Sequence, residues 1–304
     1  MPSSPSTPPD THRSAPDAGR DLGLTFAGGG SRAFYQVGLM EHWAELLMPR
    51  VAGIAACSAG AAMACMLVAE RMDEGREAFT RERAGLKRNV QPAELLRGRR
   101  PLPHEGIYRR TLLRALEGDG LRRIQQAPFP VRILAAAPPA RLGLAAGAVF
   151  GLALYQAEKR VNPKLLHPKL APRLGFRAVV MDAREARSAE ELVDFILASS
   201  AVPPVTAPVQ LSGERVLDGS LIDNAPAFLL DELGAVKKQV VMLTRRYSWA
   251  VTGEQQGRFY CSPSADVPIE RWDYREHAPV EATMELGRQD GARVKPQLRA
   301  YIDA

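Results

Sequence analysis

The chain has 304 residues, of which 46% are hydrophobic and 24% charged, so a disordered or fibrous protein is excluded. This length suffices for one large α/β domain or two small ones. Three cysteines, at positions 57, 65 and 261, are too few for a disulfide framework, and neither they nor the five histidines show the spacing of zinc ligands. We therefore expect no metal and no other cofactor, and the net charge of +6 points to anionic partners.

The chain opens with a tail and a glycine turn. Residues 1–20 are rich in proline and serine, which predicts a disordered tail. They lack a secretory signal, so the expected location is cytoplasmic, with peripheral contact at a membrane as the alternative. An apolar run at 22–27 predicts a buried strand, three glycines follow at 28–30, and helical spacing continues over 31–47.

A second strand is predicted at 51–57, and a helix rich in small residues follows from 58 to 72. The order strand, glycine turn, helix, strand, sharp turn, helix favours a parallel sheet with crossover helices. We expect an α/β fold.

A basic segment follows. Between Arg81 and Arg123 there are twelve Lys and Arg and five Asp and Glu. The net charge of this stretch, +7, therefore exceeds that of the whole chain, +6. Such a patch attracts nucleic acid or phospholipid head groups, or is a solvated helical face. No RNA-binding motif accompanies it, so we expect no nucleic acid as partner. We interpret residues 70–128 as a basic helical insertion.

Strands are predicted at 130–138 and 176–183, and an uncharged helix lies between them at 142–156. That helix is too short to cross a bilayer, which needs about 20 apolar residues. Gly143, Gly147 and Gly151 fall four residues apart and give it one smooth face. Two interpretations remain open, a buried helix and a helix that touches a lipid monolayer.

The rest of the chain continues the pattern, with a helix at 189–201, a short strand at 214–220 and a buried strand at 237–246. The last sixty residues combine loops with a helix around 282–294. We expect a catalytic domain over 21–246 and a C-terminal extension, 247–304, packed on it. The oligomeric state stays open.

The glycine run between a strand and a helix leaves backbone N–H groups free to bind an anion. A nucleotide phosphate is one candidate, but the second strand ends without the acidic residue that would bind a ribose, and no P-loop lysine follows. The other candidate is an oxyanion hole, whose donors are typically worth about 3–4 kcal/mol each.

The second strand favours the oxyanion hole. Ala56-Cys57-Ser58-Ala59-Gly60 stands where a strand turns into a helix, which is typical of a nucleophile elbow. Ala56 replaces the usual first glycine at the cost of a methyl group, and Gly60 is present. The alternative role for Ser58 is to cap the helix. No histidine has an evident catalytic setting; Asp218, at the end of a strand before Gly219, is the better base, with a plain Asp-Gly turn as the alternative.

These pieces together resemble the patatin-like phospholipase family. The sequence GGGSR at 28–32 is similar to its G-G-G-x-R/K motif, ACSAG at 56–60 to its G-x-S-x-G, and DGS at 218–220 to its D-G-G/A. The stretch ASSAVPPVTAPV at 198–209 and the N-x-P at 224–226 also resemble its signature. Motif order and spacing agree over 22–226.

The resemblance implies a three-layer α/β/α sandwich with a mainly parallel central sheet. It also implies hydrolysis of phospholipid or lysophospholipid acyl esters by a Ser–Asp dyad, Ser58 and Asp218, without histidine or calcium. Residues Gly28, Gly29, Gly30 and Arg32 would form the oxyanion loop, with Arg32 holding it or meeting a lipid phosphate. Two alternatives stay open: a soluble carboxylesterase or thioesterase with the same dyad, and a non-catalytic lipid-binding protein on the same scaffold.

Overall fold

The computed structural model describes residues 19–92, 94, 100–162, 164–203, 206–207, 209–211 and 213–304, with only the backbone described at 144, 145 and 159. All but the last two residues of the predicted tail, 1–20, lie outside this part of the chain. Arg20 is already ordered against the domain, because its guanidinium donates to the carbonyl oxygens of Met48 and Val51, each at 3.1 Å.

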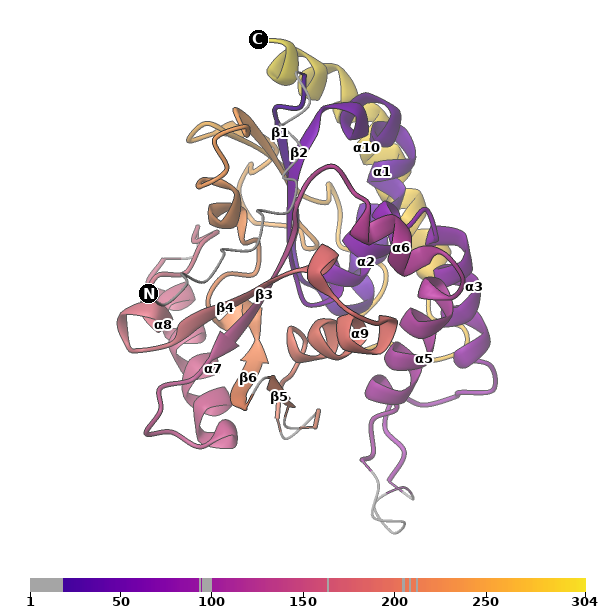
Figure 1. The fold of residues 1–304 in the computed structure, drawn as a ribbon, viewed down its shortest axis with the longest axis vertical. Coiled ribbons are helices and arrows are strands. Elements are labelled where there is room, and N and C mark those ends of the chain that lie inside the picture. The colour runs from indigo at the N-terminus through magenta and orange to yellow at the C-terminus, as the bar shows by residue number, and fades with distance from the viewer. Residues whose placement is uncertain are drawn as a thin grey trace, which may run out of the picture.

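One sheet organises the described part of the chain (Figure 1). Its strands run in the order β5-β6-β3-β2-β1-β7-β9-β8, and β4 also pairs with β3. Their bounds are β1 Leu22–Phe26, β2 Val51–Cys57, β3 Val131–Ala137, β4 Arg177–Asp182, β5 Val209–Leu211, β6 Glu214–Asp218, β7 Lys238–Met242, β8 Gly253–Gln255 and β9 Arg258–Cys261.

The centre of the sheet is parallel. The five strands β3, β2, β1, β7 and β9 pair in parallel, whereas β4 and β6 are antiparallel to β3, and β8 is antiparallel to β9. The predicted α/β class with a mainly parallel central sheet is confirmed. Because parallel strands end at the same edge, the residues that follow β1 and β2 lie next to each other.

Helices cover both faces of the sheet, which gives the predicted three layers (Figure 1). Successive residues of β2 and β3 alternate between two separate cores: Ile54 and Ile133 belong to the larger one, and Ala55 and Leu134 to the smaller. The helices are α1 Phe34–Leu47, α2 Ala59–Val68, α3 Met72–Glu82, α5 His104–Leu116, α6 Gly120–Gln125, α7 Leu144–Val161, α8 Leu170–Arg173, α9 Ala189–Ala198 and α10 Val280–Asp303.

The uncharged helix predicted at 142–156 is the first part of α7, and its two sides differ. A Cβ on Gly147 would lie 2.7 Å from Pro138, and one on Gly151 would lie 3.1 Å from Leu221, so these glycines face the small core. On the outer side Val149 and Leu152 are 64% and 48% exposed. The helix is thus half buried, and none of the described helices is long and apolar enough to span a bilayer.

The basic insertion predicted at 70–128 contains helices α3, α5 and α6 with loops between them in its described part, and acidic partners neutralise much of its charge. Arg110 pairs with Glu82, and Arg109 reaches Asp194 on α9. Further pairs join Arg114 to Glu117, Arg122 and Arg123 to Asp119, and Arg123 to Glu70. The paired arginines therefore form a solvated face of compensated charge rather than a bare cationic one.

The residues after 247 are built into the same sheet and the same helical layer. Strand β9 pairs in parallel with β7, and β8 pairs with β9. Helix α10 packs along α1, where the carbonyl of Tyr35 would lie 2.2 Å from a Cβ on Gly287, so only glycine allows this approach. Three strands, β5, β8 and β9, were not predicted, because each has only three or four residues, too few for an alternating pattern to stand out.

Candidate active site

Ser58 sits at the sharp turn between β2 and α2. Its backbone has φ 53° and ψ −130°, a conformation that residues with a side chain rarely adopt and that points to functional strain. The turn closes only because residue 60 is glycine: a Cβ there would lie 2.3 Å from the carbonyl oxygen of Phe26. The Ser58 side chain caps no backbone N–H of α2, so Ser58 stands at a sharp strand-to-helix turn without the alternative capping role.

The end of α9 fixes the serine and the aspartate to each other. The N–H of Ser58 donates to the Ser199 hydroxyl at 2.8 Å, and that hydroxyl donates to the Leu134 carbonyl at 2.6 Å. The Ser199 carbonyl accepts from the N–H of Gly219 at 3.2 Å, next to Asp218. Ser199 thus joins three segments that are distant in sequence, and sequence reasoning assigned it no role beyond its place in the stretch 198–209.

Asp218 is only 2% exposed and ends β6 beside β3. Its Oδ1 accepts from the N–H of Ser220 at 2.8 Å and lies 3.7 Å from the Sγ of Cys57, the residue before Ser58. Burial, followed by the nearby Asp218 charge, raises the pKa of the Cys57 thiol, so this thiol stays protonated and is a donor. The backbone of Ser220 therefore orients the carboxylate, which is brought beside the turn that carries Ser58.

The glycine loop follows β1 and is held by three hydrogen bonds around Gly28. Its N–H donates to the Asn224 carbonyl at 2.9 Å, and its carbonyl accepts from the Asn224 side chain at 3.0 Å and from the Thr244 hydroxyl at 2.5 Å. The N–H groups of Gly29 and Gly30 have no acceptor among the described residues. The N–H of Gly28 is thus already hydrogen-bonded, whereas the N–H groups of Gly29 and Gly30 are available to donate to a ligand.

Gly30 cannot be replaced by a larger residue at this point of the loop. Its φ of 58° lies in the left-handed region, and a Cβ there would lie 2.0 Å from the carbonyl oxygen of Arg271. The same carbonyl accepts from the N–H of Ser31 at 3.0 Å. A segment more than 200 residues further along the chain therefore presses on the loop and fixes its shape.

Arg32 is half buried, and its Nε has no hydrogen-bond acceptor among the described atoms. Burial, and then the charges of Arg271 and Arg245, lower its pKa. The guanidinium is thus placed next to two other cations rather than in an ion pair that would hold the loop.

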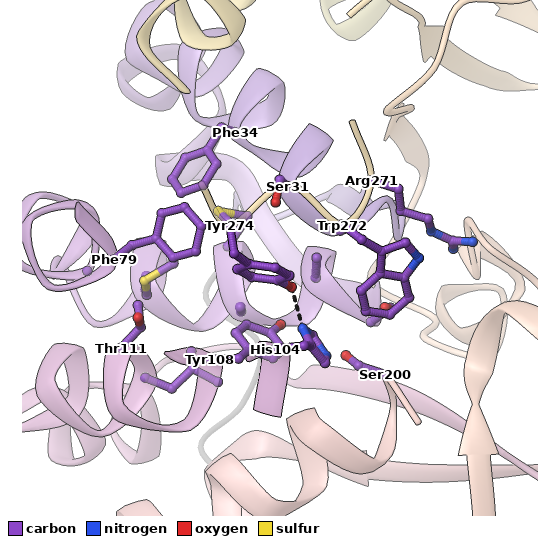
Figure 2. A pocket seen from close by; sticks show the side chains of 18 residues that line it. Ser31, Phe34, Phe79, His104, Tyr108, Thr111, Ser200, Arg271, Trp272 and Tyr274 are labelled. Atoms are coloured by element: carbon purple, nitrogen blue, oxygen red, sulfur yellow. Dashed lines mark hydrogen bonds between the residues drawn. The ribbon is translucent and has the colours of Figure 1, made fainter. Parts of the chain in front are cut away.

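A small cavity of about 40 Å³ is lined by Ser58, Gly30 and side chains of the neighbouring helices. Its wall is mostly apolar and aromatic and includes Phe34, Met63, Met66, Phe79, Tyr108, Leu112, Trp272 and Tyr274 (Figure 2). Several of these come from α3 and α5, inside the basic insertion. The insertion therefore contributes an apolar inner side to the site besides its charged outer side.

His104 also lines this cavity, although no sequence pattern indicated a role for it. It starts α5, its Nδ1 forms a hydrogen bond with the Tyr274 hydroxyl, and its ring stands edge-on to Trp272 at 4.7 Å. Burial lowers its pKa to about 4, so the ring is neutral at pH 7. Because its neighbours lie about 170 residues away, no local pattern could have revealed this position.

A second series of hydrogen-bonded polar side chains supports the glycine loop through the segment that contains Asn224. His167 joins the Asp223 carboxylate at 2.7 Å to the Tyr260 hydroxyl at 2.9 Å, and Asp223 also accepts from the N–H of Ala225 at 2.9 Å. Burial raises the pKa of Asp223, and its contact with His167 opposes that effect. This chain fixes the segment whose Asn224 holds Gly28.

Comparison with known proteins agrees with the geometry. The family model described as patatin-like phospholipase matches residues 24–231, more than half of the chain. No curated protein matches. Among solved structures, VipD from Legionella pneumophila is similar at 11% identity and a TM-score of 0.44, over 93% of this chain and 66% of the VipD chain. The family model, together with the elbow and the glycine loop, leads to one conclusion: the chain belongs to the patatin-like phospholipase family.

Proposed function

We propose that this protein is a lipid acyl hydrolase that cleaves carboxylic esters of phospholipids or lysophospholipids through a covalent intermediate on Ser58. The observation that carries the proposal is the strained serine after β2, which lies beside two free backbone donors and lines an apolar cavity. Family membership implies the same class of reaction. The assignment of individual residues is ours.

The reaction would begin when the Ser58 Oγ attacks the ester carbonyl and its proton passes to the Asp218 carboxylate. Asp218 is suited to this role because the Ser220 N–H and the Cys57 thiol both approach Oδ1, which leaves Oδ2 for the serine. The oxyanion that forms would accept from the N–H groups of Gly29 and Gly30.

Collapse of this tetrahedral intermediate breaks the ester bond, and the departing alcohol takes the proton from Asp218. Asp218 then removes a proton from water, which attacks the acyl-enzyme, and the second collapse returns the proton to Ser58 as the fatty acid leaves. The acyl chain would occupy the cavity between α2, α3 and α5, whose wall excludes water from the ester.

A fluorophosphonate, which phosphonylates an activated serine, tests the nucleophile directly. We expect one adduct per chain on Ser58, none in Ser58→Ala, and loss of at least about 10³-fold of ester hydrolysis in Ser58→Ala and Asp218→Asn. Ser248→Ala and Asp73→Asn are matched controls, since both positions are exposed. Absence of an adduct in the folded wild-type protein would favour the non-catalytic lipid-binding alternative, and near-normal turnover in Asp218→Asn would reject the dyad.

A further inference from the structure

Three arginines from distant segments surround the glycine loop. Arg32 belongs to the loop itself. Arg245 follows Thr244, whose hydroxyl binds the Gly28 carbonyl at 2.5 Å. Arg271 covers Gly30, since a Cβ on that glycine would lie 2.9 Å from the Cγ of Arg271. Only Arg32 belongs to a motif that the sequence analysis identified.

These cations lack carboxylate partners. In the described part of the chain none of Arg32, Arg245 and Arg271 forms an ion pair, whereas the surface arginines of the insertion do. Arg245 lies 4.4 Å from the ring centre of Tyr247, and the buried Arg32 Nε has no acceptor among the described atoms. Glu270 and Asp266 act on Arg32 only from beyond ion-pair distance, and both are exposed.

Grouping uncompensated guanidinium groups costs free energy, because like charges repel and their burial removes water. An anion with several oxygen acceptors offsets both costs, and guanidinium groups match phosphate oxygens in geometry. The cluster stands at the loop that would hold the reacting carbonyl. An anion bound there would therefore belong to the substrate.

The cavity has matching polarity along its length. Figure 2 shows Phe34 and Phe79 at one side, and Arg271 beside Trp272 at the opposite side. A molecule with an apolar tail and an anionic head would fit this arrangement with its ester between the two. A free phosphate has no group for the apolar part.

We propose that Arg271 and Arg245, together with Arg32, bind the phosphate of the substrate's head group and make the enzyme select acyl phospholipids whose head carries net negative charge. An ammonium group on the same head would meet the same arginines and be repelled, so zwitterionic lipids are poorer substrates. The inference rests on the proposed hydrolase function and adds to it the class of head group.

The test compares three lipids with the same single acyl chain: lysophosphatidylglycerol, lysophosphatidylcholine and neutral monoacylglycerol, each below its critical micelle concentration. For the wild-type protein we expect kcat/KM to be highest for lysophosphatidylglycerol. In Arg271→Gln and Arg245→Gln the preference for lysophosphatidylglycerol over monoacylglycerol should fall about 10- to 100-fold, the effect of losing one charge-assisted contact. Arg299→Gln on α10, an exposed position, removes the same charge far from the site and should keep the wild-type preference.

The result separates head-group recognition from a structural role. An equal loss on both lipids in Arg271→Gln would mean that the side chain only holds the loop, and the proposal would be wrong. A wild-type protein with equal kcat/KM on all three lipids would also overturn it. Neither outcome touches the proposed function, which fails if Ser58→Ala hydrolyses monoacylglycerol like the wild-type protein or if the folded wild-type protein forms no fluorophosphonate adduct. Added glycerol phosphate should inhibit lysophosphatidylglycerol hydrolysis, and lack of inhibition in the millimolar range would count against a phosphate site.

Discussion

Two regions that meet at the cavity are built in different ways. The proposed catalytic edge, residues 28–32, 57–60 and 218–220, is held by buried backbone contacts so close that no side chain fits at Gly30 or Gly60. The helical insertion at 70–128 is held by apolar side chains on its inner side and by exposed ion pairs on its outer side. Substitution should therefore be costly at the edge and graded across the insertion.

This difference has a functional meaning. Catalysis requires donors and nucleophile in fixed positions, which backbone packing provides. Recognition of an acyl chain requires only a wall of suitable shape, which side chains such as Phe79 and Leu112 provide. The edge would thus determine whether the reaction occurs, and the inner side of the insertion would determine which chain is accepted.

Replacing one glycine by alanine in the edge, and one in the insertion, gives the sharpest contrast between the two regions. In Gly60→Ala the new methyl would lie 2.3 Å and 2.6 Å from the carbonyl oxygens of Phe26 and Ala27. Phe26 ends β1 and Ala27 follows it, so this buried backbone cannot move aside. We expect a loss of more than about 4 kcal/mol in the free energy of unfolding and no ester hydrolysis. Urea denaturation and turnover measure both.

Gly106→Ala on α5 is the matched change in the insertion. Its methyl would meet only the guanidinium of Arg110 at 3.1 Å, the end of an exposed, flexible side chain. Alanine favours a helix interior over glycine by about 1 kcal/mol, so this variant should be as stable as the wild-type protein or more so. Equal destabilisation of the two variants would contradict the comparison.

The sequence predicts much of the catalytic edge because its signals are local. A strand followed by three glycines, and another followed by small-x-Ser-x-Gly, specify turns of a particular shape within a few residues. The central strands were equally predictable, since strands buried on both faces form continuous apolar runs. The fold class follows from their alternation with helices.

The remaining parts of the site depend on contacts between distant segments. Ser199 reaches Ser58 across 141 positions, and the Arg271 carbonyl accepts from the N–H of Ser31, which lies 240 positions earlier in the chain. His104 lies in a proline-flanked stretch that looks like a loop, yet it lines the cavity. Net charge was also misleading locally, because Asp194, which pairs with Arg109, and Glu70, one of the two acids that pair with Arg123, lie outside the stretch from Arg81 to Arg123.

Truncation of the cavity wall tests the role of the insertion. Leu112 is 1% exposed and lines the cavity, so Leu112→Ala should cost about 3 kcal/mol and widen the cavity. We expect longer or bulkier acyl chains to gain in kcat/KM relative to short ones, measured with esters of graded length. Leu113→Ala, half buried on the same helix but not part of the wall, is the control. Identical chain-length profiles for both variants would mean that the chain binds elsewhere.

The buried imidazole in the insertion gives a pH dependence of defined sign. The pKa of His104 is about 4 in the folded chain against 6.5 when unfolded, so between these pH values the unfolded chain binds a proton that the folded chain does not. The free energy of unfolding falls by up to about 3 kcal/mol as pH drops through this window. Above pH 6.5 the imidazole is neutral in both states, and this loss is absent. His104→Gln should flatten the dependence in urea denaturation at pH 7 and 4.5. His277→Gln, with a 93% exposed side chain, should leave it unchanged.

The smallest effect is expected on the outer side of the insertion. Arg114 and Glu117 form an ion pair at 3.1 Å with side chains 58% and 60% exposed, where water and salt screen the attraction. Arg114→Gln should change the free energy of unfolding by less than about 0.5 kcal/mol and leave the head-group preference as it is. A clear loss of activity on anionic lipid vesicles, with unchanged activity on dispersed lipid, would give this outer side a membrane-binding role. The charged outer side would then do more than keep the insertion solvated. Its contrast with the apolar inner side, which lines the cavity, would no longer hold.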